Sequence, residues 1–413
     1  MFGKIKRFIK SNDWLFQGLK QGLLYFRYLK SIGRKSKYGS LPQFEVGDNI
    51  IVYAKGRHCW FGYYDKSPLN EGSSYALYLS VAKDAKDGDK AEVCLYNMQT
   101  KEQRVIGETR TWNWQQGAME QWIGKETVSY NSFDEVKKVY QTVRLNVNTG
   151  VKTSTQRAAY FYNRDFTKYL SLNFFRLDKF AKGYGYPYSV DSMDIERDGI
   201  WEVNVKDNEP RLILSLHEVM AYEAKDYMQC QHYINHVAYC PDERYIIFIH
   251  RWQVKGGEFV SRLMKYDLQE KKLTALLDNG HVSHYCWKSD KELMIFATNE
   301  RDEKGYMVVN IETGKNYRLD GLPTEDGHPT YSDDKKWVVT DTYPNNHRDQ
   351  YLFLYRVEDK KLFRVDKLHS PFKYFNENRC DLHPRWSMDN RYLLADNTAQ
   401  GMRTLKIYDI RHA

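Results

Sequence analysis

Short apolar runs separated by polar turns recur at nearly regular intervals in the second half of the chain. Each repeat opens with a histidine, has an aromatic residue three positions later and an aspartate six positions later, and continues as an apolar run. The opening histidines are His236, His284, His328 and His383, which stand 48, 44 and 55 residues apart. This spacing is the length of one four-stranded β-propeller blade.

The pattern also predicts the strands of each blade. A first strand runs from the histidine to a turn, which the aspartate closes through its own backbone. The second strand then returns antiparallel, and we expect these second strands at residues 245–248, 293–296, 338–340 and 393–395.

Three less regular repeats precede these four. Tyr63 stands in the histidine position of the first, and Trp122 and Tyr162 open the next two. Together the repeats predict an all-β, seven-bladed propeller over residues 45–413. The last blade has only three strands after its histidine, and a strand near residues 49–54 can supply the fourth and close the ring.

Composition agrees with one large folded unit. The 413 residues (49.1 kDa) are 42 % hydrophobic, which provides a large core and excludes a disordered chain. The six cysteines form no C-x-x-C pair, and several lie in apolar runs typical of buried free thiols. No secretory signal or bilayer-spanning run is recognised, so we expect a cytoplasmic protein.

The positive charge belongs to the N-terminal segment. Residues 1–38 hold ten lysines and arginines against one acid, Asp13, whereas the whole chain has a net charge of +8. Nucleic-acid binding is therefore not expected, because such proteins usually carry the charge on the folded domain. Within residues 1–44 apolar side chains recur every three or four positions, which predicts a basic amphipathic helix. Two interpretations stay open: peripheral contact of residues 1–38 with the inner membrane, or a helix packed on the propeller.

The first strands of a propeller begin on one face near the central axis, so the four histidines and Tyr63 should converge there. A single histidine at such a position often only hydrogen-bonds a neighbouring blade, but four equivalent ones favour a functional pocket. Two or three neutral imidazoles can bind a divalent metal, and another can act as a general base. Candidate substrate-binding side chains lie at second-strand ends and in connecting loops: Trp114, Gln115, Gln116, His232, His250, Trp252, Asp341, Tyr343 and Asp396.

Three features resemble the propeller polysaccharide lyases and their relatives, namely oligogalacturonate lyases, ulvan lyases and related α-L-rhamnosidases. They are residues 58–68 (HCWFGYYDKSP), residues 112–117 (WNWQQG) and the histidine-led blade starts. The resemblance covers residues 45–413 and extends to propeller proteins of bacterial surface-polysaccharide clusters.

The two lyase groups imply different roles. Resemblance to oligogalacturonate lyases implies His284, His328 and His383 as ligands of a divalent ion such as Mn, Ca or Zn, with His236 as the base. Resemblance to ulvan lyases implies His58 or His236 acting with Tyr63 or Tyr64. No nucleotide cofactor is expected.

The favoured hypothesis is β-elimination at a uronic acid in an acidic oligosaccharide or polysaccharide. The proton at C5 becomes removable when the neighbouring carboxylate is neutralised, for which Arg176, Arg251 and the metal are candidates. One alternative is glycoside hydrolysis, which ordinarily needs two carboxylates; Asp65, Glu120, Asp341 and Asp396 are available. Another is a non-catalytic propeller that binds glycan or assembles partners.

Overall fold

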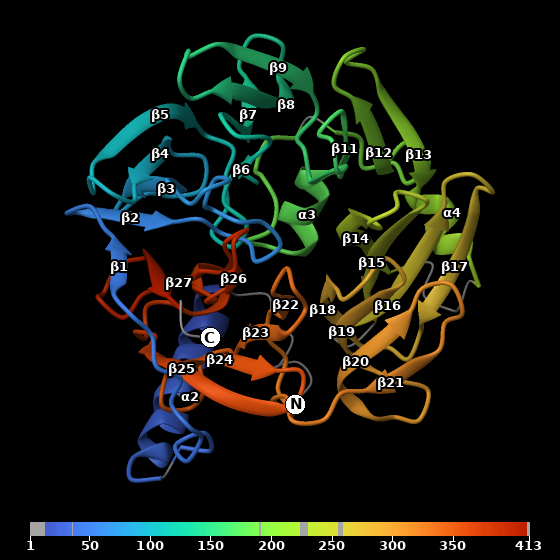
Figure 1. Ribbon diagram of the computed structural model, residues 1–413. Helices are drawn as coiled ribbons and strands as arrows, with labels where there is room; N and C mark the ends of the chain where they lie inside the picture. Colours follow the sequence, from blue (N-terminus) through green and yellow to red (C-terminus); the bar gives the residue numbers. More distant parts are fainter. Residues whose placement is uncertain (1–12, 35, 190, 224–229, 255–258, 411–413) are drawn as a thin grey trace.

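Seven antiparallel sheets of four strands surround one central axis (Figure 1). The computed structural model describes residues 13–410 except for 35, 190, 224–229 and 255–258. We number the blades by the chain order of their innermost strands. Blades 1 to 3 comprise β2(Arg57–Trp60), β3(Tyr75–Ala82), β4(Ala91–Asn97), β5(Gln103–Thr109); β6(Gln121–Trp122), β7(Thr127–Asp134), β8(Val139–Asn146), β9(Lys152–Gln156); and β10(Phe161–Tyr162), β11(Lys168–Ser171), β12(Gly199–Asn204), β13(Pro210–Ser215). Blades 4 to 6 comprise β14(Gln231–Tyr239), β15(Tyr245–Gln253), β16(Phe259–Asp267), β17(Lys272–Leu277); β18(Val282–Trp287), β19(Glu292–Thr298), β20(Lys304–Asn310), β21(Asn316–Arg318); and β22(Thr330–Tyr331), β23(Trp337–Asp341), β24(Asp349–Arg356), β25(Lys361–His369).

Blade 7 joins the two ends of the chain and closes the ring. It contains β26(Arg385–Trp386), β27(Tyr392–Asn397) and β28(Thr404–Asp409), and its outermost strand is β1(Asn49–Val52). The strand β1 pairs antiparallel with β28, with Val52 opposite Leu405. The predicted propeller, its seven blades and its closing strand are confirmed.

Aspartate side chains close the turns between first and second strands, as the repeat predicted. Asp242, Asp334 and Asp389 each accept a hydrogen bond from the backbone N–H two residues later. In blade 5 the hydroxyl of Ser289 takes that role instead of Asp290. All these turns lie on the face of the propeller opposite the connections that lead into the first strands.

The repeated histidine or tyrosine was predicted to start the first strand of each blade, and the structure places it elsewhere. His236 and His284 lie inside β14 and β18, at register shifts where two residues are left out of the ladder. His328 and His383 precede the short strands β22 and β26. In blade 1 the first strand, β2, ends before Tyr63 rather than beginning there. The repeated position therefore marks a break in the innermost strand, and this break turns its side chain towards the axis.

The helices lie in connections and at the N-terminus. α3(Phe174–Phe180) follows β11 and is capped by Asn173, and α4(Leu216–Ala221) follows β13 with a capping box between Ser215 and Glu218. A 3₁₀ turn, η1(Asn376–Asn378), lies between β25 and β26.

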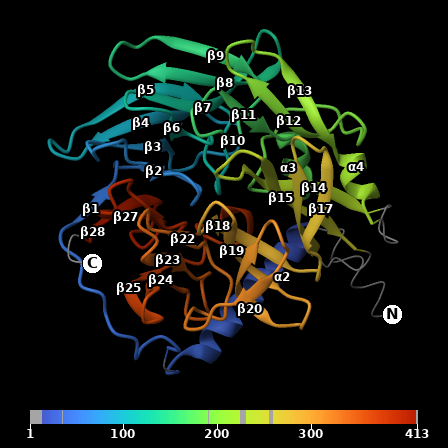
Figure 2. The ribbon, with the colours of Figure 1, turned by 45° about the vertical axis from the view of Figure 1, so that its right-hand side comes forward.

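The N-terminal helix α2(Asp13–Ser31) belongs to none of the seven sheets and lies against the propeller (Figure 2). The part of the predicted helical segment that falls within residues 1–12 lies outside the described residues. Among the described residues, no helix is both long and apolar enough to cross a membrane.

Two neighbouring residues of β1 test the ring closure. Val52 is buried against blade 7, whereas Ile51 points outward. We expect Val52→Asp to lower the unfolding temperature strongly, because it removes about 1.5–3 kcal/mol of apolar burial and also buries a carboxylate. Ile51→Asp should have little effect. Differential scanning calorimetry of the two variants makes the comparison, and equal unfolding temperatures would contradict closure by β1.

Candidate functional site

Six aromatic side chains meet on the axis of the propeller. His236, His284, His328, His383 and Tyr63 form a closed ring of contacts, and Tyr64 lies against Tyr63 and three of the histidines; we call these six residues the central ring. All six are buried. The ring centroids are 5.1 Å apart for His236 and His284, 4.1 Å for His284 and His328, 4.3 Å for His328 and His383, 5.2 Å for His383 and Tyr63, and 5.6 Å for Tyr63 and His236. The structure thus brings together residues from blades 1, 4, 5, 6 and 7.

Three tyrosines hold His236. Its backbone is left-handed (φ 50°), a conformation that costs energy for a residue with a side chain. The hydroxyl of Tyr160 accepts a hydrogen bond from its N–H, and the hydroxyl of Tyr285 donates to its carbonyl at 2.6 Å. The hydroxyl of Tyr63 lies 2.9 Å from Nδ1 of its imidazole. These contacts fix the backbone and the imidazole of His236.

Burial determines the charge of His236. Desolvation, together with the neighbouring His284 and Arg251, lowers the pKa of His236 well below its ordinary value. Burial likewise raises the pKa of Tyr63 well above its ordinary value. At neutral pH the pair is therefore a neutral imidazole and a protonated phenol, which can accept one proton and donate another.

Carboxylates support the other histidines. Asp341 accepts hydrogen bonds from Nδ1 of His328 at 2.9 Å and from the N–H groups of His328 and His383. Burial disfavours the imidazolium, but Asp341 outweighs it and raises the pKa of His328. Asp326 lies 3.4 Å from Nδ1 of His284.

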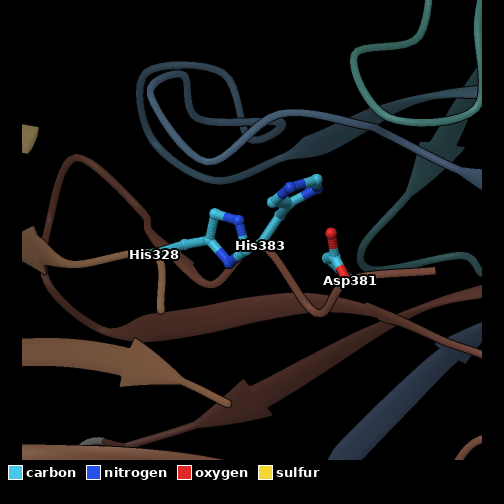
Figure 3. A group of neighbouring side chains, drawn as sticks. All are labelled: His328, Asp381 and His383. Atoms are coloured by element: carbon cyan, nitrogen blue, oxygen red, sulfur yellow. The ribbon is translucent and has the colours of Figure 1, made fainter. Parts of the chain in front are cut away.

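One group of side chains in this ring has the donor set of a metal site. The ligand atoms of His328, Asp381 and His383 all lie within 4.8 Å of one another, and Figure 3 shows the two imidazoles beside the carboxylate. Among the described residues, Nε2 of His328 and Nε2 of His383 are buried without a hydrogen-bond partner. In the neutral imidazole of His328, Nδ1–H donates to Asp341 and Nε2 carries the lone pair. A carboxylate that orients a ligand histidine in this way is typical of protein metal sites.

Asp381 is absent from the set predicted from sequence, which had His284 in its place. It stands two residues before His383 but at no repeated position, so the repeat gave no signal for it. Burial opposes its ionisation, yet the Arg379 guanidinium, 2.6 Å away, lowers the pKa of Asp381 and keeps it a carboxylate.

Several predicted site residues border the central ring. Tyr343 contacts the ring of His328 and lies under the guanidinium of Arg379. Arg251 donates to the side chain of Asn235 and is partly exposed. Gln116 donates to the Tyr160 hydroxyl that holds His236, while Gln115 donates to the backbone carbonyl of Arg379.

Other predicted residues have protein partners that occupy their polar groups. The guanidinium of Arg176 bonds Asp198 and the carbonyls of His232 and Met193. Asp396 accepts from the N–H groups of Phe61 and Gly62 and pairs with Arg385 at 2.9 Å.

His58, His232 and His250 are not members of the central ring. Nδ1 of His58 accepts from the Arg403 N–H and its Nε2 lies 3.1 Å from the Lys83 carbonyl; burial lowers the pKa of His58 to about 4. Trp114 packs on His58 and on Trp60. His232, His250 and Trp252 stack on one another within blade 4, with the two imidazoles 2.9 Å apart.

Comparison with solved structures finds the same architecture in two oligogalacturonate lyases. One, from Vibrio parahaemolyticus, is 12 % identical with a TM-score of 0.63; the other, described in complex with manganese, is 15 % identical with a TM-score of 0.65. Each match covers 90 % of this chain and 99 % of the other. No family model and no curated protein sequence matches the chain. At this level of identity the likeness shows that the chain has the seven-bladed propeller fold of these structures.

Proposed function

We propose that this propeller is a carbohydrate-active enzyme that cleaves a uronate-containing glycan by β-elimination. The observation that carries the proposal is the hydrogen-bonded pair of neutral His236 and protonated Tyr63, beside the group of His328, Asp381 and His383. The fold shared with oligogalacturonate lyases supports a saccharide substrate.

His236 and Tyr63 supply the proton transfers of this reaction. The imidazole of His236 accepts the C5 proton of the uronate, and the electron pair left behind forms the C4–C5 double bond as the C4–O bond breaks. The hydroxyl of Tyr63 donates a proton to the leaving oxygen. Tyr64 is less suited to this role, because its hydroxyl donates to the Tyr285 carbonyl and accepts from the Tyr285 N–H.

The substrate carboxylate must be neutralised for the C5 proton to become acidic. Arg251 is the candidate cation, since its charge acts on His236 and His284 and its guanidinium is partly exposed. The residues His328, Asp381 and His383 fit a divalent ion such as manganese, which when bound would supply further positive charge at the carboxylate.

Hydrolysis is less well supported. Of the four carboxylates considered for it, Asp341 and Asp396 accept hydrogen bonds from the backbone, and Asp65 pairs with Lys66 at 2.8 Å. Glu120 is buried, and desolvation raises the pKa of its carboxyl to about 8. None of the four presents a free carboxylate opposite another.

The reaction is tested with uronate-containing oligosaccharides. We expect a new ultraviolet absorbance from the conjugated C4–C5 double bond and no solvent oxygen in the product. His236→Ala should lower kcat about 10²–10⁴-fold, the usual contribution of a positioned base. His58→Gln is the matched control and should retain most activity, because His58 contacts only backbone groups and packed aromatic rings. Incorporation of solvent oxygen into a saturated product would refute elimination.

Metal binding has a readout that is independent of activity. We expect the protein to bind Mn²⁺ in isothermal titration calorimetry after treatment with chelator, and Asp381→Asn to abolish that binding. Asp341→Asn should weaken it about 10–100-fold, because Asp341 orients His328. His284→Ala distinguishes the two ligand sets. If this variant still binds Mn²⁺, the set with Asp381 is supported. If His284→Ala loses binding while Asp381→Asn keeps it, the set predicted from sequence is supported.

We also propose that α2 binds an anionic membrane surface at the cytoplasmic face. The helix is seated on the propeller through Tyr25 and Tyr28, which pack on Phe372, and through Ser31, which bonds His347. This seat uses only one side of the helix. Five large apolar side chains remain between 48 % and 62 % exposed: Leu19, Leu23, Phe26, Leu29 and Ile32.

The charge of the segment around α2 also favours an anionic membrane surface. Residues 18–44 contain six lysines and arginines and no acidic residue. A helix with exposed leucines and phenylalanine beside cations matches the acyl boundary and the anionic head groups of a cytoplasmic leaflet.

Vesicle binding tests this surface. Co-sedimentation with phosphatidylglycerol-containing vesicles should fall at least tenfold in a Leu19→Ser, Leu23→Ser, Phe26→Ser variant. Each substitution removes apolar groups that the bilayer would bury, at about 0.8 kcal/mol per methylene. Val136 is an exposed apolar residue between β7 and β8, outside α2. The control variant Val136→Ser should therefore bind vesicles as well as the unmodified protein does. Binding should also weaken as salt is raised. No binding by the full chain, or equal binding by all variants, would contradict the proposal.

A further inference from the structure

A cavity opens on the face of the propeller that carries the hairpin turns, opposite the connections into the first strands. Its volume is about 500 Å³, within the usual range for small-molecule sites. It is lined by first-strand ends or turns of six of the seven blades, among them residues 65–67, 163–164 and 241. The cavity therefore lies around the central axis.

A narrower cavity of about 160 Å³ continues inward from it. The two share Asp65, Phe161 and Trp287 in their walls. The inner one ends at Tyr64 and His236 of the central ring, and its lining includes none of the three residues of the metal group. His236 is thus reached from the turn side of the propeller.

Aromatic side chains form part of the wall of the outer cavity, beside polar and charged ones. Phe161 and Trp287 are only partly buried, and Trp122, Tyr162, Phe166 and Tyr239 also line it. Flat aromatic faces exposed inside a cavity suit a ligand with an apolar face, and the C–H face of a pyranose ring is one.

Two residues that line this cavity carry hydrogen-bond donors without partners. Among the described residues, Nε2 of Gln121 and Nε1 of Trp287 are buried with no acceptor. A buried donor without an acceptor destabilises the protein, so a ligand oxygen that reaches such a donor gains binding free energy. Lys66 and Asp65 form an ion pair at the wall, so both charge signs are present.

From these observations we infer that the turn-side cavity is a second saccharide site, which binds a short oligosaccharide by stacking on Phe161 and Trp287 and by hydrogen bonds from Gln121 and Trp287. The pyranose ring meets both requirements, since its C–H face stacks and its ring and hydroxyl oxygens accept. The inference does not rest on the proposed elimination, because Gln121, Phe161 and Trp287 take no part in the proposed proton transfers or in the metal group.

The test starts from an array of di- to tetrasaccharides with neutral, uronic acid and amino-sugar units. We expect at least one to bind, and its affinity is then measured by calorimetry on variants. Gln121→Leu and Trp287→Phe each remove one donor while keeping bulk, and each should weaken binding about 3- to 10-fold. Phe161→Ala should weaken it further, through loss of stacking.

Asp381→Asn separates this site from the proposed active site. It should abolish metal binding and leave saccharide binding in the cavity unchanged. No bound saccharide on the array would overturn the inference. It would equally be overturned by binding that is insensitive to Gln121→Leu, Trp287→Phe and Phe161→Ala, or by binding that only Asp381→Asn removes. Circular dichroism of each variant shows that the fold is retained, and Lys66→Met provides a further lining change if Trp287→Phe fails to fold.

Discussion

The carboxylate of Asp341 holds together the part of the structure on which the candidate site depends. It lies at the end of β23 in blade 6 and accepts hydrogen bonds from the backbone of His328 in its own blade and of His383 in the next. A buried carboxylate needs such donors, and the two histidines leave the regular ladder to provide them. Asp341 therefore both links blade 6 to blade 7 and orients the histidines of the metal group.

A second buried pair continues this tie across the ring closure. Arg385 pairs with Asp396 in blade 7 and donates to the backbone carbonyls of Tyr63 and His383. Asp396 in turn accepts from Phe61 and Gly62 in blade 1. The inner boundary between blades 7 and 1 is thus where the backbone of Tyr63 is held so that its side chain lies beside His236. A change in Arg385 or Asp396 should therefore disturb the proton-transfer pair as well as the contact between these blades.

The sequence was sufficient to predict the repeat, the seven blades, the closing strand and the convergence of four histidines with Tyr63, because each follows from spacing and from propeller geometry. It did not predict what happens between blades. Asp381 occupies no repeated position, and the tyrosines that hold His236, Tyr160 and Tyr285, look like ordinary strand residues. Arg176 looked like a free cation near the axis, yet Asp198, 22 residues away in the chain, neutralises it. Such pairings depend on tertiary contacts that no local pattern records. The sequence also did not predict the cavity on the turn side of the propeller. Its lining residues lie in first strands and in the turns after them, where they had been interpreted only as markers of the blades.

The loop between β25 and β26 connects the N-terminal helix to the site. Its first part carries Phe372, on which Tyr25 stacks with ring centroids 4.1 Å apart, and its last part carries Arg379 and Asp381. The buried Arg348 holds the loop on both sides of Phe372 by donating to the carbonyls of Ser370 and Tyr374. Because Arg348 holds the loop on both sides of Phe372, the contact with α2 rests on a part of the loop that blade 6 fixes. The helix seat and the carboxylate of the metal group therefore depend on different arginines, Arg348 for the first and Arg379 for the second.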